Sequence, residues 1–120
     1  MKQIRILLAD DHNVMRAGLK LLLERHPGFR VISEASEGNQ AIENAIATKP
    51  DVAVLDIAMP KLSGIEAAQR LSRRGAPVVI LLSTYDESTF DWTHSGAVDY
   101  IAKSSFSPER LLRSWQRTLR

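Results

Sequence analysis

Acidic side chains end two apolar runs of this 120-residue chain. Asp10 and Asp11 follow the run that begins at Ile4, and Asp56 ends the run that begins at Val52. Three carboxylates held within a few ångströms of one another repel, and they raise one another's pKa unless a cation neutralises them. The sequence has no cysteine, and oxygen ligands suit a hard ion such as Mg²⁺. The three acids are therefore candidate ligands of a magnesium ion.

A hydroxyl group and an ammonium group occupy similar places later in the chain. Ser83 follows the apolar run 77–82, and Lys103 follows the run 98–102. Taken singly, such residues have ordinary structural roles, since acids after strands commonly cap helices or form turns and lysines are commonly solvated. In the same way His12, next to the acidic pair, is expected only to begin the first helix. The joint pattern of three carboxylates, a hydroxyl and an ammonium group indicates a reactive site.

The elements that must position these groups alternate between two patterns. Short apolar runs of strand type lie at residues 4–9, 30–34, 52–57, 77–82 and 98–102. Segments with helical spacing follow them, at residues 14–26, 39–48, 65–73, 87–94 and 108–119. This order predicts a single α/β domain over residues 1–120, with a parallel sheet and right-handed crossovers. The carboxyl ends of parallel strands meet at one edge, where ligands bind, so we expect the polar residues to converge there.

The composition limits the class of protein. With 44% hydrophobic and 25% charged residues the chain is of ordinary globular type, and a net charge of +2 is too small to indicate a nucleic-acid partner. No apolar run approaches the roughly 20 residues of a membrane-spanning helix, and no secretory signal begins the chain. The lack of cysteine suits a reducing compartment. We expect a cytoplasmic protein that binds no membrane and, through this domain, no nucleic acid.

Four motifs carry a resemblance to a known family. In chain order they read "LADDH", "VLDIAMP" followed by Gly64, "VVILLS" and "DYIAK". Together they resemble the receiver domain of bacterial two-component response regulators, and the resemblance covers essentially the whole chain. It implies a flavodoxin-like (βα)5 fold, with a parallel five-stranded sheet of order 2-1-3-4-5 and helices on both faces.

The resemblance also implies the chemistry of the strand ends. It makes Asp56 the phosphoryl acceptor in a Mg²⁺-dependent reaction, in which Mg²⁺ is bound by Asp56, by Asp11, by Asp10 through water, and by the main-chain carbonyl of Ala58. Lys103 would neutralise phosphoryl oxygens in a loose, in-line transition state. The domain would thus be a signalling module with its own autophosphorylation and autodephosphorylation chemistry, and not otherwise an enzyme.

Two further residues match the switch of the family. Ser83 would be drawn toward the phosphoryl group, and Tyr100 would turn inward, so that the face made by the fourth helix, fifth strand and fifth helix changes. The resemblance implies a sensor histidine kinase as the phosphoryl donor and allows a homodimer. The segments "RAGLKLLLE" and "ISEASEG" are similar to receivers that precede a LuxR-like helix-turn-helix domain, which implies transcription regulation through an output domain outside this chain.

An alternative reading remains open. Residues 86–95 hold β-branched and capping residues and few strong helix formers, which points to an altered fourth helix. The alternative function is therefore a phosphorylation-independent receiver that docks or dimerises. Two enzyme or carrier classes fit less well: a haloacid-dehalogenase-type enzyme needs an acid where Ala58 stands, and a flavodoxin needs a phosphate-binding loop where Asp10 and Asp11 stand.

Overall fold

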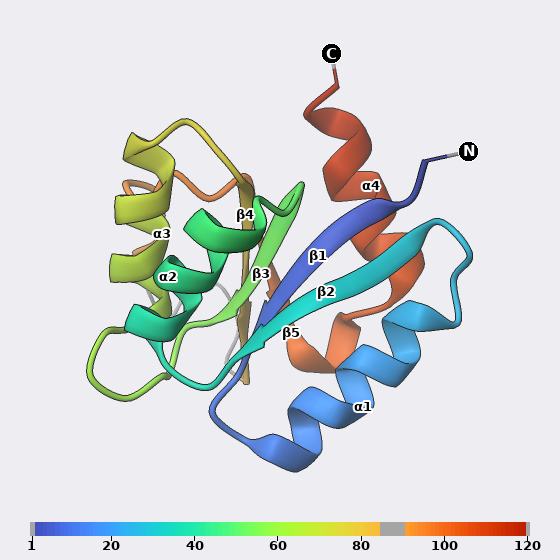
Figure 1. Cartoon of the computed structure of the whole chain (residues 1–120), viewed down its shortest axis with the longest axis horizontal. Helices are drawn as coiled ribbons and strands as arrows, with labels where there is room; N and C mark the ends of the chain where they lie inside the picture. Colours follow the sequence, from blue (N-terminus) through green and yellow to red (C-terminus); the bar gives the residue numbers. More distant parts are fainter. Residues whose placement is uncertain (1, 85–90, 120) are drawn as a thin grey trace.

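The computed structural model describes residues 2–84 and 91–119, in which strands and helices alternate along the chain (Figure 1). The strands are β1 (Ile4–Ala9), β2 (Phe29–Ala35), β3 (Val52–Asp56), β4 (Val78–Ser83) and β5 (Asp99–Ala102). The helices are α1 (Asn13–Glu24), α2 (Gly38–Thr48), α3 (Gly64–Arg73), α4 (Pro108–Arg117) and the short 3₁₀ helix η1 (Lys103–Ser105).

The five strands form one parallel sheet of order β2-β1-β3-β4-β5. This confirms the predicted flavodoxin-like order. β1 and β3 are direct neighbours, with Ala9 opposite Leu55. The residues that follow Ala9 therefore lie beside Asp56, the last residue of β3.

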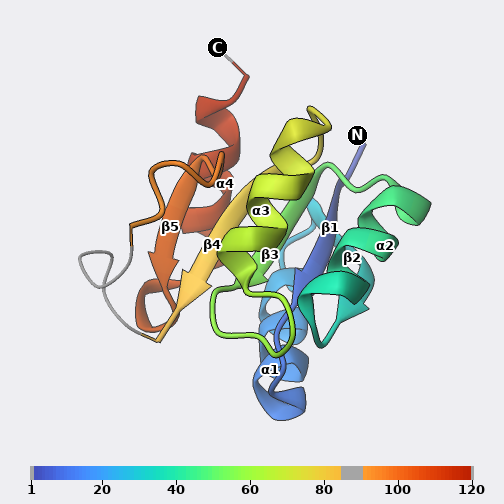
Figure 2. The same ribbon diagram turned by 90° about the vertical axis from the view of Figure 1, so that its left-hand side faces the viewer.

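Helices cover both faces of the sheet (Figures 1 and 2): α1 and α4 lie on one face, α2 and α3 on the other. Successive side chains of a strand point to opposite faces, so each strand contributes to two apolar layers. In β1, Leu7 and Ala9 pack in the layer under α2 and α3, whereas Ile6 and Leu8 pack under α1 and α4. All four side chains are fully buried, as expected for a strand covered on both faces.

Predicted and observed elements agree to within one or two residues, except after β4. The helix predicted at 87–94 is wrong where the structure describes it, because residues 91–94 form no helix and end in a turn. Asp91 Oδ1 accepts hydrogen bonds from the backbone nitrogen of Thr93 (3.2 Å) and from Thr93 Oγ1 (2.6 Å). Such local bonds compete with helix formation. Positions 87–90 of that prediction lie outside the described residues.

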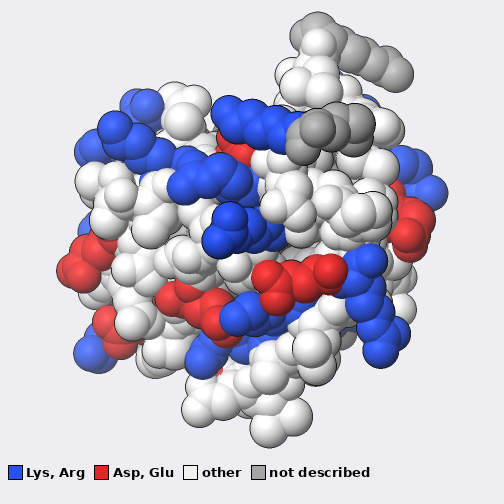
Figure 3. Space-filling model, turned by 45° about the vertical axis from the view of Figure 1, so that its right-hand side comes forward, with Lys and Arg blue, Asp and Glu red and all other residues white. Residues whose placement is uncertain are grey.

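The charged surface is mixed. In Figure 3, acidic and basic side chains alternate over the lower half of the face, and basic side chains prevail over the upper half. α4 carries Arg110, Arg113 and Arg117. Among the described residues, no helix is long and apolar enough to cross a membrane.

Candidate functional site

The sheet brings the predicted polar residues to one edge. Asp10 directly follows β1 and Asp56 ends β3, while Ser83 ends β4 and Lys103 follows β5. Because all five strands run in the same direction (Figure 2), these positions share the carboxyl edge of the sheet. The predicted convergence of carboxylates, hydroxyl and ammonium group is confirmed as geometry.

Lys103 joins the two buried carboxylates. Its Nζ donates to Asp10 Oδ2 at 2.9 Å and to Asp56 Oδ2 at 3.1 Å, and the side chains of both acids are at most 3% exposed. Burial raises the pKa of Asp56, and the opposing effect of Lys103 only partly offsets it. Burial lowers the pKa of Lys103, but the hydrogen bond from Lys103 to Asp10 and the charge of Asp56 outweigh it, so the net pKa is raised. The ammonium group is therefore charged at neutral pH.

The acidic pair and Asp56 form a cluster of metal-ligand type. One ligand atom from each of Asp10, Asp11, His12 and Asp56 lies within 4.8 Å of the others. Asp11 Oδ1 is buried and has no hydrogen-bond partner among the described residues. A buried carboxylate oxygen without a donor is satisfied well by a cation. The three carboxylates thus fit a hard divalent ion such as Mg²⁺.

His12 belongs to this cluster although sequence reasoning gave it only a structural role. Its Nδ1 lies 3.0 Å from Asp11 Oδ1 and 3.5 Å from Asp10 Oδ1. The signal that was available is its residue type, since histidine is a common metal ligand and here directly follows the acidic pair.

The loop after β3 is folded back onto Asp56. The backbone nitrogen of Ala58 donates to Asp56 Oδ1 at 3.2 Å, and that of Gly64 donates to the Ile57 oxygen at 2.9 Å. A Cβ atom on residue 64 would overlap the backbone oxygen of Asp56, so only glycine allows this close approach. The start of α3 therefore fixes the backbone of the predicted phosphoryl acceptor.

The two predicted switch residues are both buried. Ser83 is 3% exposed at the end of β4, and Tyr100 is 4% exposed within the apolar layer under α2 and α3. The Tyr100 ring lies 5.9 Å from the ring of Trp92, measured between centroids. Ser83 lies at the edge of the sheet that holds the acidic cluster, whereas Tyr100 lies in the apolar layer beside Trp92. Their switching role stays a prediction.

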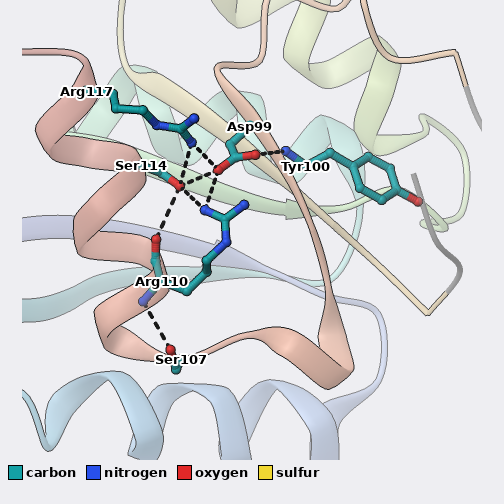
Figure 4. Close-up of polar contacts among 6 residues, drawn as sticks. All are labelled: Asp99, Tyr100, Ser107, Arg110, Ser114 and Arg117. Atoms are coloured by element: carbon teal, nitrogen blue, oxygen red, sulfur yellow. Dashed lines mark hydrogen bonds and ion pairs between the residues drawn. The ribbon is translucent and has the colours of Figure 1, made fainter. Parts of the chain in front are cut away.

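A second polar network was missed by sequence reasoning. Asp99 lies in β5 next to Tyr100 but faces α4, where Arg110 Nη1 and Arg117 Nη2 each donate to its Oδ2 at 2.6 Å (Figure 4). Ser114 Oγ also donates to this oxygen. The three donors lie on one face of α4 at helical spacing. Nothing in the sequence paired that face with Asp99, which is 11 to 18 residues away.

The comparisons with known proteins decide the family. The sequence matches the response regulator receiver domain over residues 6–116. The chain belongs to this family. As a receiver domain it is a signalling domain of two-component systems.

Relatives of this receiver domain have different output functions. The chain is 41% identical over 105 residues to a protein-glutamate methylesterase/protein-glutamine glutaminase of Alkalilimnicola ehrlichii, and 37% identical over 109 residues to the transcriptional regulatory protein LiaR of Bacillus subtilis. These matches cover 84% and 88% of this chain, but only 27% and 52% of the relatives. The chain thus spans about half the length of these relatives or less.

Solved structures share the receiver fold. A LuxR-family two-component response regulator from Aurantimonas sp. SI85-9A1 superposes with a TM-score of 0.87 at 33% sequence identity. The match covers 98% of this chain and 86% of that one.

Proposed function

We propose that this receiver domain accepts a phosphoryl group on Asp56 from a sensor histidine kinase, in a Mg²⁺-dependent reaction. The observation that carries the proposal is the contact of Lys103 with Asp56 Oδ2 beside the buried Asp11 Oδ1, which accepts no hydrogen bond from the described residues. The first contact supplies a fixed positive charge at the attacking carboxylate. The Asp11 oxygen fits one side of a cation pocket that Asp10 completes, with the Ala58 carbonyl as an additional ligand.

The chain's residues divide the chemistry between them. An Asp56 carboxylate oxygen attacks phosphorus, an O–P bond forms, and the bond from phosphorus to the donor breaks. Lys103 keeps its charge because two carboxylates raise its pKa, and it stabilises negative charge on the phosphoryl oxygens. When bound, Mg²⁺ would supply further positive charge to these oxygens. Burial of Asp56 limits the access of water to the acyl phosphate.

Ser83 and Tyr100 would report the phosphorylation. In this proposal the Ser83 hydroxyl donates to a phosphoryl oxygen, and the Tyr100 ring changes its position beside Trp92. The transmitting face is then β5 with α4 and residues 91–98. The phosphoryl group shifts this equilibrium only by its different interaction with the two states.

The output would be transcription regulation through a DNA-binding domain outside this chain. The similarity to LiaR and to a LuxR-family regulator supports this assignment. The methylesterase relatives favour a second candidate, an effector enzyme domain controlled by the same receiver. A receiver that forms a homodimer on phosphorylation is compatible with either output.

Acetyl phosphate with Mg²⁺ tests the reaction directly. Intact mass spectrometry should show one added phosphoryl group on the wild type and none on Asp56→Asn. Asp91→Asn, which removes an exposed carboxylate outside the site, should be phosphorylated as the wild type is. A wild type that binds no Mg²⁺ and gains no phosphoryl mass would instead favour the phosphorylation-independent docking receiver.

A further inference from the structure

His12 directly precedes α1, and its backbone oxygen accepts a hydrogen bond from the Arg16 nitrogen at 2.9 Å, but its side chain takes no part in the helix. It is the N-cap residue, yet its side chain makes no capping hydrogen bond within the described part of the chain. Its backbone nitrogen donates to Asp10 Oδ1 at 2.9 Å, so an acid of the cluster holds the residue in place. The side chain is 71% exposed, which leaves it free of any role in the apolar core.

The imidazole is directed to the acidic cluster. Nδ1 lies 3.0 Å from Asp11 Oδ1, but Asp11 Oδ1 receives no hydrogen bond there. The contact is within ion-pairing distance but lacks the geometry of a hydrogen bond. Neighbouring ligands of an octahedral ion at about 2.1 Å are separated by about 3.0 Å, and opposite ligands by about 4.2 Å. The four ligand atoms of Asp10, Asp11, His12 and Asp56 all lie within 4.8 Å of one another, a slightly wider spread, so small side-chain adjustments would bring them onto one ion.

We propose that His12 Nδ1 is a direct ligand of the divalent ion in the acidic pocket, and that it gives the pocket a preference for transition ions over Mg²⁺. This inference rests on the proposed metal pocket and deepens it. Carboxylate oxygens suit Mg²⁺ and Mn²⁺, whereas imidazole nitrogen suits ions such as Ni²⁺ and Zn²⁺. A nitrogen ligand therefore stabilises bound Ni²⁺ far more than bound Mg²⁺.

Calorimetric titration of the untagged protein with Ni²⁺ and, separately, with Mg²⁺ measures this preference. His12→Ala should weaken Ni²⁺ binding at least about tenfold, as expected for the loss of a metal-site group. The same substitution should change Mg²⁺ binding less than about twofold, since Mg²⁺ gains little from nitrogen. His12→Phe, which keeps a ring without a ligand atom, should reproduce both results. His26→Ala and His94→Ala should leave both affinities unchanged.

The outcomes separate this inference from the proposed function. Equal Ni²⁺ affinity of wild type and His12→Ala would overturn the inference. An equal loss of Ni²⁺ and Mg²⁺ affinity would also overturn it, because His12 would then only shape the pocket. In both cases Mg²⁺-dependent phosphorylation of Asp56 by acetyl phosphate would leave the proposed function standing. A wild type that binds neither ion would overturn both.

Discussion

Lys103 balances two carboxylates that the fold buries. Removal of an ion from water is costly, and a buried charge is tolerated when it is paired and hydrogen-bonded. Asp10 and Asp56 share the single ammonium group through their Oδ2 atoms, which leaves one negative charge in excess on these two residues. The partly exposed Asp11 adds a second. This excess is the physical basis for the proposed cation binding at the edge of the sheet.

Lys103→Met tests this balance. Because two buried carboxylates lose their partner, we expect the free energy of unfolding to fall by about 3–5 kcal/mol. We also expect phosphorylation by acetyl phosphate to slow by about 100-fold, since a charge at the transition state is lost. Urea denaturation and time-resolved intact mass measure the two effects. The matched control Lys20→Met breaks the partly exposed contact with Glu34 (3.4 Å) and should cost less than about 1 kcal/mol. Similar losses in both variants would contradict the central role of Lys103.

At the scale of elements, the loop between β3 and α3 holds Asp56, the proposed phosphoryl acceptor. Gly64→Ala introduces a Cβ that overlaps the backbone oxygen of Asp56, so the loop must shift. We expect a loss of about 1–3 kcal/mol in unfolding free energy and slower phosphorylation. By contrast, Gly18→Ala adds a Cβ that meets nothing within 4 Å on α1 and should stabilise by about 0.5–1 kcal/mol. Thermal unfolding of both variants measures the two changes in stability. A Gly64→Ala variant as stable as the wild type would argue against the close approach of residue 64 to the backbone of Asp56.

The turn before β5 places Trp92 beside Tyr100, so tryptophan emission can report on the proposed switch. In a Trp115→Phe background, acetyl phosphate with Mg²⁺ should change the emission of Trp92 because Tyr100 moves. Tyr100→Ala should abolish the change without preventing phosphorylation. Unchanged emission of a fully phosphorylated protein would exclude a movement of Tyr100 against Trp92.

The share of the structure that could be predicted from the sequence differs from element to element. Apolar runs and the polar residues that follow them predicted all five strands and the shared edge of Asp10, Asp56 and Lys103. The order of the strands needed a family resemblance, because periodicity does not specify which strands are neighbours. The prediction of a helix at 87–94 is wrong where the structure describes it, since Asp91 and Thr93 form local hydrogen bonds with each other. The Asp99 network depends on how α4 packs on β5, and local patterns contain no such information.

At the scale of the whole molecule, the Asp99 network fastens the last helix to the edge strand of the sheet. Asp99 is only 8% exposed and accepts from Arg110, Ser114 and Arg117. Burial acts to raise the pKa of Asp99, but hydrogen bonds from Arg110 and Ser114 outweigh it and lower the pKa. The ionised form is therefore favoured by the folded state.

The lowered pKa of Asp99 predicts how the stability of the fold depends on pH. A lowered folded-state pKa means that Asp99 stabilises the fold above about pH 4 and that this contribution is lost as the pH falls through the folded-state value. Asp99→Asn should lower the free energy of unfolding by about 1–3 kcal/mol at pH 7 and flatten its decline below pH 4. Urea titrations between pH 7 and pH 2.5 measure both. The exposed Glu43→Gln is the control, and an Asp99→Asn profile parallel to that of the wild type would contradict the prediction.

The central claim is that Asp56 is the residue that becomes phosphorylated, and chemical mapping of the acyl phosphate tests it most directly. The wild type is incubated with acetyl phosphate and Mg²⁺ and then reduced with borohydride, which converts an aspartyl phosphate to homoserine. Peptide mass spectrometry then locates the homoserine in the chain. The structure predicts homoserine at position 56 and nowhere else. Homoserine at position 10 or 11, or a chain with none, would contradict the claim.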